Sequence, residues 1–304
     1  QYTTVVLAFL AGMIFMTYMT RMGNRDMTGD MAQAQLPVVH AEQDGVLYNE
    51  MHGYVEDMDG ASMRDSVIGV SEDHKVGLAL EKYNAQIKSV SYEVRSLDMS
   101  RLIEGGDDLQ AEDDGKYLHI SLTLKDLLTQ GEEYLLVLKV QTEDQDLVRF
   151  YSILTYLGTN HVQDCVDFAQ RFHEMTLTGD SDGVLNYLEQ DGSMDGKNLG
   201  YINIHSRSGP VTWGDMQVEQ IGDPSLRFTE LESDITALTM EYQVTNTETS
   251  EQYQVREAYR LRYTSTRIYL LAYERWTDKI LEPGRQLVED GKLSFGIQSS
   301  NPVY

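Results

Sequence analysis

Residues 253–276 read YQVREAYRLRYTSTRIYLLAYERW, and this stretch sets the architecture of the C-terminal part of the chain. Apolar and aromatic side chains alternate with polar ones through both halves, which is the period of a β-strand. The tetrapeptide TSTR between the halves breaks the alternation. The pattern therefore predicts two neighbouring antiparallel strands joined as a hairpin.

The same alternation collects arginines on one face of the first strand, and the second strand adds two more. The residues of this predicted cationic patch are Arg256, Arg260, Arg262, Arg267 and Arg275. The planar guanidinium suits carboxylate and phosphate groups, so the patch predicts an anionic glycan, a teichoic phosphate or the carboxylates of a surface protein as its ligand. The alternative is cross-strand pairing with local acids such as Glu241, Glu257 and Glu274.

Before these strands, the apolar period lengthens to that of a helix. The stripe consists of Val162, Cys165, Val166, Phe168, Ala169 and Phe172. A second helix is expected at about 184–190, and further strands at 212–221 and 236–245. Two helices followed by a curved antiparallel sheet resemble the NTF2-like or cystatin-like α+β class, so residues 159–281 are predicted to form such a module.

Residues 46–158 carry short alternating runs separated by Gly and Asp clusters, typical of a β-sandwich. The candidate strands are 51–57, 76–81, 89–96, 117–124, 134–141 and 147–157, with 66–70 as a further one. The segment 128–134, LTQGEEY, resembles the tyrosine corner of fibronectin type III domains through Leu128, Gly131 and Tyr134. Gln130 stands where that family usually has proline. The resemblance implies an Ig-like sandwich with a structural corner.

The first residues, 1–20, contain no charged side chain and are long enough to cross a bilayer as a helix. They predict a transmembrane anchor that contacts the lipid bilayer, with 21–45 as a juxtamembrane linker. A cleaved signal peptide and a buried core helix are the alternatives. Arg21 and Arg25 would draw the following side inward, but long domains translocate largely regardless of charge. We therefore expect a single-pass membrane protein with its bulk outside the cytoplasm.

The net charge and the cysteine content of the chain exclude several classes of protein function. The 304 residues carry a net charge of -25, which repels nucleic acid. With one cysteine, Cys165, the chain has no internal disulfide and no multi-cysteine zinc site, as expected of a cytosolic or Gram-positive surface protein. No H-E-x-x-H, G-x-S-x-G or phosphate-loop motif is present. The sequence therefore predicts no enzyme and no cofactor.

One segment, residues 178–189, matches part of an EF-hand calcium loop. Asp180, Asp182 and Glu189 take ligand positions, but Thr178 replaces the first aspartate. The competing interpretation is a turn whose aspartates cap the next helix. Two interpretations of this segment therefore remain: a calcium site and a helix cap.

Residues 282–304 are expected to begin a further β-rich domain in a chain cut from a longer protein. From YLLAYERW at 269–276 to DGKLSFGIQSSNPVY, the sequence resembles uncharacterised clostridial single-pass membrane proteins, which implies no known activity. We expect a non-catalytic binding or scaffold protein of the bacterial cell surface. The alternatives are the spacer of a cell-wall or carbohydrate-active enzyme whose catalytic part is missing, and a calcium-responsive surface protein.

Overall fold

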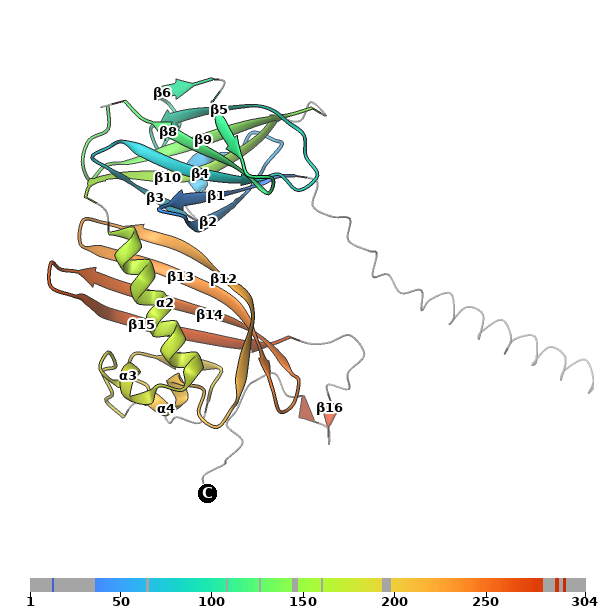
Figure 1. Ribbon diagram of the computed structural model, residues 1–304, viewed down its shortest axis with the longest axis vertical. Helices are drawn as coiled ribbons and strands as arrows, with labels where there is room; N and C mark the ends of the chain where they lie inside the picture. Colours follow the sequence, from blue (N-terminus) through green and yellow to red (C-terminus); the bar gives the residue numbers. More distant parts are fainter. Residues whose placement is uncertain are drawn as a thin grey trace, which may run out of the picture. The chain divides into compact units, whose positions relative to one another are not determined.

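The computed structural model of the protein is built mainly of β-strands (Figure 1). It describes residues 13, 36–63, 66–107, 109–125, 127–143, 147–159, 161–192, 198–280, 288–289 and 292–293. The described residues from 36 onward belong to one compact unit. Within it, the strands up to residue 158 form two sheets, and a third sheet follows with its helices.

The first two sheets are five-stranded and pack as a sandwich. One sheet, in the order β2-β1-β4-β8-β7, consists of β1 (Val38–Gln43), β2 (Val46–His52), β4 (Lys75–Glu81), β7 (Ala111–Asp113) and β8 (Tyr117–Thr123). The other, in the order β3-β10-β9-β5-β6, consists of β3 (Val67–Ser71), β5 (Ile87–Arg95), β6 (Leu102–Gly106), β9 (Glu133–Thr142) and β10 (Leu147–Gly158). A single 3-10 turn, η1 (Gly60–Ser62), precedes β3. The sandwich therefore begins within the segment predicted as a linker, because β1 starts at Val38.

Alternation along the strands supplies the core between the two sheets. Leu78 and Leu80 of β4 and Val94 and Val140 of β5 and β9 are fully buried. At the predicted corner, the Tyr134 hydroxyl accepts a hydrogen bond from the Thr129 N–H at 2.9 Å. The corner thus ties the loop before β9 to its first residues.

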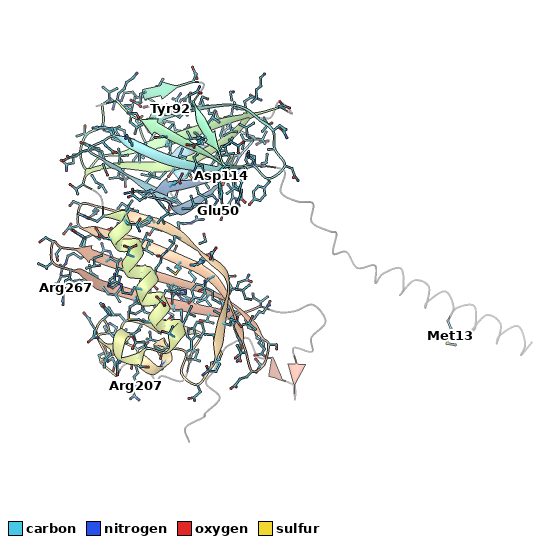
Figure 2. All side chains as sticks on the ribbon, viewed as in Figure 1. Met13, Glu50, Tyr92, Asp114, Arg207 and Arg267 are labelled. Atoms are coloured by element: carbon cyan, nitrogen blue, oxygen red, sulfur yellow. The ribbon has the colours of Figure 1, made fainter. Side chains whose placement is uncertain are left out.

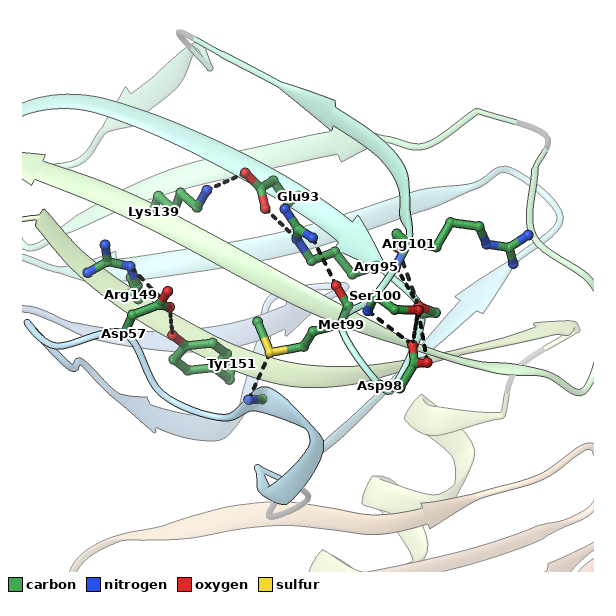
Figure 3. A network of polar contacts seen from close by, with 12 residues as sticks. Asp57, Glu93, Arg95, Asp98, Met99, Ser100, Arg101, Lys139, Arg149 and Tyr151 are labelled. Carbon is green, nitrogen blue, oxygen red and sulfur yellow. Dashed lines mark hydrogen bonds and ion pairs between the residues drawn. The ribbon is translucent and has the colours of Figure 1, made fainter.

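A polar network on the sandwich holds the turn between β5 and β6 (Figure 3). Glu93 receives hydrogen bonds from Lys139 and from Arg95 Nε, the latter at 2.6 Å. Arg95 Nη1 donates to the Met99 carbonyl at 3.0 Å, and the Met99 sulfur accepts from the Gly60 N–H at 3.0 Å. Every contact joins parts of the sandwich, so the network serves the fold.

The third sheet has the order β11-β15-β14-β13-β12. Its strands are β11 (Tyr201–Asn203), β12 (Val218–Leu231), β13 (Ile235–Asn246), β14 (Gln252–Tyr263) and β15 (Ile268–Lys279). The long helix α2 (Val162–Thr178) lies across one face, which we name the inner face (Figure 1). Phe172 of α2 packs against Tyr259 and Tyr273 of that face, and Cys165 is fully buried. The short helices α3 (Ser181–Leu185) and α4 (Ser208–Val211) follow α2.

The helices differ from the prediction. In place of two helices, the described residues contain α2, α3 and α4, and the expected helix at 184–190 is α3, which ends at Leu185. Gly183 and the N-cap Asp180 move the helix start toward the N-terminus, because the Asp180 carboxylate accepts from the Gly183 N–H at 2.9 Å. The strand expected from residue 212 begins at Val218, after a turn at Trp213 and Gly214 with positive φ.

The predicted transmembrane helix is also corrected. None of the helices in the described part of the chain is long and apolar enough to span a membrane. Apart from Met13, the segment 1–20 lies outside the described residues, as does most of the linker 21–45. Of the expected further domain at 282–304, the described residues are the paired strands β16 (Val288–Glu289) and β17 (Lys292–Leu293).

A buried asparagine joins the sandwich to the third sheet. Asn49 in β2 is fully buried, donates through Nδ2 to the Val67 carbonyl at 2.7 Å and accepts from the Phe228 N–H of β12 at 2.7 Å. Its φ of 52° is in the left-handed region, which asparagine tolerates better than most residues. The Tyr48 ring also packs edge-on against Phe228. This contact links the sandwich directly to β12.

Candidate functional site

The arginines of β14 lie on the outer face of the third sheet, opposite α2. Arg256, Arg260 and Arg262 are all exposed there. Arg260 makes a bidentate ion pair with Glu230, with nitrogen–oxygen distances of 3.1 and 2.9 Å. Arg256 lies 3.9 Å from the Glu241 carboxylate. The cross-strand pairing that was the alternative prediction therefore holds for both of these arginines.

Arg275 does not belong to the patch. A β-bulge at Leu271 adds one residue to β15, because Arg260 pairs with Ala272 while Leu261 pairs with Leu270. In a regular strand, Arg267 and Arg275 would share a face, because they are an even number of residues apart. The extra residue reverses the faces for all later side chains, so Arg275 lies on the inner face. Its side chain is fully buried and donates to the carbonyls of Val211 at 2.7 Å and Pro210 at 2.9 Å.

The remaining arginines gather around Tyr269 at the start of β15. The Arg267 guanidinium lies 3.9 Å from the centre of the Tyr269 ring and that of Arg262 lies 5.4 Å from it. Arg267 projects from the hairpin between β14 and β15 (Figure 2). The hairpin borders a groove of about 700 Å³. We name it the arginine groove; its lining consists of Phe168 and Arg171 of α2, residues 186–189 after α3, and residues 266–270.

The cations of the arginine groove are available to a ligand. Arg171 and Arg267 are exposed, and the described residues place no carboxylate within ion-pair distance of either guanidinium. The groove also contains Glu189, Tyr187 and Tyr269. An anion can bind here without first breaking an internal ion pair.

A second polar cluster lies on the inner face, beneath α2. Glu257 is fully buried and accepts hydrogen bonds from the hydroxyls of Tyr259 at 2.7 Å and Tyr273 at 2.8 Å. His173 Nδ1 of α2 lies 3.1 Å from its carboxylate, and His173 Nε2 lies 2.6 Å from Gln220 Oε1. Both neighbours of the imidazole are acceptors, which favours the doubly protonated ring.

The two charges of this cluster stabilise each other. Burial alone would lower the pKa of His173, but the hydrogen bond and negative charge of Glu257 raise it. Burial alone would likewise raise the pKa of Glu257, but the hydrogen bond and charge of His173 and the charge of Arg275 lower it. The cluster is a closed ion pair with its oxygen atoms satisfied, and it serves as the polar centre of the module's core.

Sequence reasoning missed this cluster, although a signal was present. The prediction groups Glu257 with acids that pair with the outer arginines, yet its alternation with Val255 and Tyr259 places it on the apolar face. A carboxylate on a face of buried residues requires a partner. His173 extends the helical stripe of α2 by one position after Phe172, but only the structure shows which element it meets.

The three residues predicted to bind calcium lie at different sites. Asp180 caps α3, Asp182 lies in the first turn of that helix, and Glu189 lines the arginine groove. Within the described ranges, no group of three or more His, Cys, Asp or Glu side chains is placed to hold a metal ion. The structure thus does not bring Asp180, Asp182 and Glu189 together as ligands.

Comparisons with known proteins do not assign this chain to a family. No protein family and no curated protein matches the chain. An engineered protein of known structure is 14% identical with a TM-score of 0.25 over 41% of this chain, which spans 21% of that protein. CopC from Methylosinus trichosporium OB3b is 15% identical with a TM-score of 0.22 over 36% of this chain and 100% of its own. Likenesses this weak carry no argument about function.

Proposed function

We propose that the protein is a non-catalytic binding protein of a Gram-positive cell surface, and that its arginine groove binds carboxylate or phosphate groups of a surface polymer or protein. The observation that carries the proposal is a groove of about 700 Å³ lined by Arg171 and Arg267, two exposed cations that have no acidic partner within ion-pair distance among the described residues. This volume is within the range of ligand sites in proteins.

The chemistry of the groove favours an extended anion. Arginine binds carboxylate and phosphate in a planar, bidentate manner. Tyr187 and Tyr269 add flat surfaces against which a sugar ring or a peptide side chain can pack. Because the lining comes from α2, the segment after α3 and β15, the groove is supported by regular elements on two sides.

The remaining features fit a surface protein. The tyrosine corner at Tyr134 supports an Ig-like sandwich, and a long helix across a curved sheet supports an NTF2-like module. Both are scaffolds without inherent chemistry, so function is argued from the groove. The single cysteine is compatible with a Gram-positive surface protein and equally with a cytosolic protein.

Binding of wall teichoic acid, a phosphate polymer, and of poly-glutamate by the 304-residue chain tests this proposal. Isothermal titration calorimetry should show binding of at least one polyanion that weakens as salt is raised, because exposed charges are screened. The double variant Arg171→Glu/Arg267→Glu should bind at least tenfold more weakly.

The matched control is Arg101→Glu, which makes the same charge change at an exposed arginine of the sandwich. It should bind within twofold of the wild type. The proposal fails if neither polyanion binds, or if the control weakens binding as much as the groove variant does.

A further inference from the structure

The arginine groove contains an open strand edge. In the order β11-β15-β14-β13-β12, β15 pairs with β14 along one edge and with β11 along the other. That strand pairs with Glu274, Arg275 and Trp276 and with no earlier residue of β15. Among the described residues, the first part of β15 therefore has no strand beside it, and this part lines the groove.

The hydrogen-bond pattern shows which backbone groups point into the groove. Thr264 donates to the Arg267 carbonyl at 3.1 Å, which closes the hairpin. Hydrogen-bonded and non-bonded pairs alternate along antiparallel strands, so Arg262 and Tyr269 form the next bonded pair. The N–H and C=O groups of Ile268 and Leu270 consequently point away from β14. At the other end, Thr277 donates to the Gly200 carbonyl at 3.0 Å on that same far edge.

The side chains around this edge differ on its two sides. Phe168 and Tyr187 line the groove near α2 and α3, whereas Arg267 lies over Tyr269 on the outer side. A strand added to β15 would alternate its side chains between these two surroundings. Apolar residues would meet the aromatic side, and acidic residues would meet Arg267, while Arg171 of α2 borders the aromatic side.

We infer that the arginine groove binds an extended peptide segment with alternating apolar and acidic residues, which pairs through its backbone with Ile268 and Leu270 of β15. This inference rests on the proposed function and names its ligand class. Strand addition of this kind takes affinity from main-chain hydrogen bonds and specificity from alternate side chains. A glycan or a teichoic polymer could bind the arginines but could not continue the sheet.

The probe is the acetylated and amidated peptide EVEVEVE, titrated into the full chain. Two derivatives test the backbone: one carries N-methyl groups on all valines, and the other on all glutamates except the first. Because alternate residues of a strand direct their N–H groups to opposite edges, one derivative loses the N–H groups that face β15 and the other keeps them. Each derivative is the control for the other.

The expected result is that the parent peptide binds, that one derivative binds at least tenfold more weakly, and that the other stays within threefold. Arg171→Glu/Arg267→Glu should weaken the parent peptide at least tenfold. Equal binding of both derivatives and the parent overturns strand addition but leaves an anion-binding groove. Binding of teichoic acid without binding of the peptide also overturns strand addition and leaves the groove as an anion site. If neither ligand binds, the proposed function fails as well.

Discussion

At the scale of single residues, the two faces of the third sheet carry charged side chains in different environments. Glu257 and Arg275 are fully buried on the inner face, whereas Arg256 and Arg260 are exposed and paired on the outer face. A buried carboxylate is costly unless its oxygens are satisfied, and Glu257 meets that condition with two tyrosine hydroxyls and His173. The ion pair therefore makes stability depend on pH.

The pH dependence follows from the two pKa shifts. The pKa of His173 is raised in the folded state, so its contribution is complete below the unfolded value of 6.5 and is lost as the pH rises through the folded value. The pKa of Glu257 is lowered, so its contribution is complete above 4.5 and is lost as the pH falls through the folded value. Both contributions are complete between pH 4.5 and 6.5.

The variant His173→Gln tests this window. In urea unfolding, the free-energy difference between the wild type and this variant should be largest at pH 5 to 6 and should shrink as the pH rises above the raised pKa of His173. Breaking a buried pair costs about 3–5 kcal/mol. A difference that is flat or grows with pH would show that His173 is neutral in the fold. Glu241→Gln, at the exposed pair with Arg256, should change stability by less than about 0.5 kcal/mol at every pH.

At the scale of elements, most of the alternating runs correspond to observed strands. The strand expected at 51–57 is wrong, because β2 ends at His52. The expected strands at 76–81, 117–124, 134–141 and 147–157 correspond to β4, β8, β9 and β10, because each has buried residues to create a pattern. The strand β7 has only exposed residues, so no alternation indicates it. β11 has three residues, too few to show a period.

The positions of the predicted arginines depend on a β-bulge that the sequence does not reveal. Arg267 and Arg275 share a face only in a regular strand, and the bulge at Leu271 separates them. The arginine groove also requires Arg171 of α2, which lies outside the predicted patch. Of the predicted patch, the structure places only Arg267 in the lining of the groove and Arg262 beside its Tyr269 wall. The proximity of α2 to the β14–β15 hairpin arises from tertiary packing, and no local sequence pattern indicates it.

At the scale of the whole molecule, Asn49 links the sandwich to the sheet that carries the groove. Its amide bridges the Val67 carbonyl and the Phe228 N–H, both at 2.7 Å. Asn49→Asp places a carboxylate oxygen against that carbonyl in a fully buried position, and we expect a loss of about 3 kcal/mol in the free energy of unfolding. Asn49→Gly keeps the left-handed backbone but removes both hydrogen bonds, so it should lose about 1–3 kcal/mol.

Urea unfolding followed by tryptophan fluorescence measures these losses, because both tryptophans, Trp213 and Trp276, lie in the C-terminal part. Asn198→Asp is the matched control, since Asn198 is exposed and its side-chain oxygen, which accepts from the Gly200 N–H, is retained. Its effect should stay below about 0.5 kcal/mol. Wild-type stability in both Asn49 variants would mean that this bridge does not hold the two parts together.

The most direct test of the central claim is a hydrogen-exchange footprint of the wild-type chain with and without the polyanion that it binds. If the arginine groove is the site, binding slows exchange in residues 186–189 and 264–270, which line and adjoin it. Exchange in the sandwich and in residues 252–260 of β14 should stay unchanged. Protection confined to the outer face or to the sandwich, with the groove segments exchanging as before, would contradict the account.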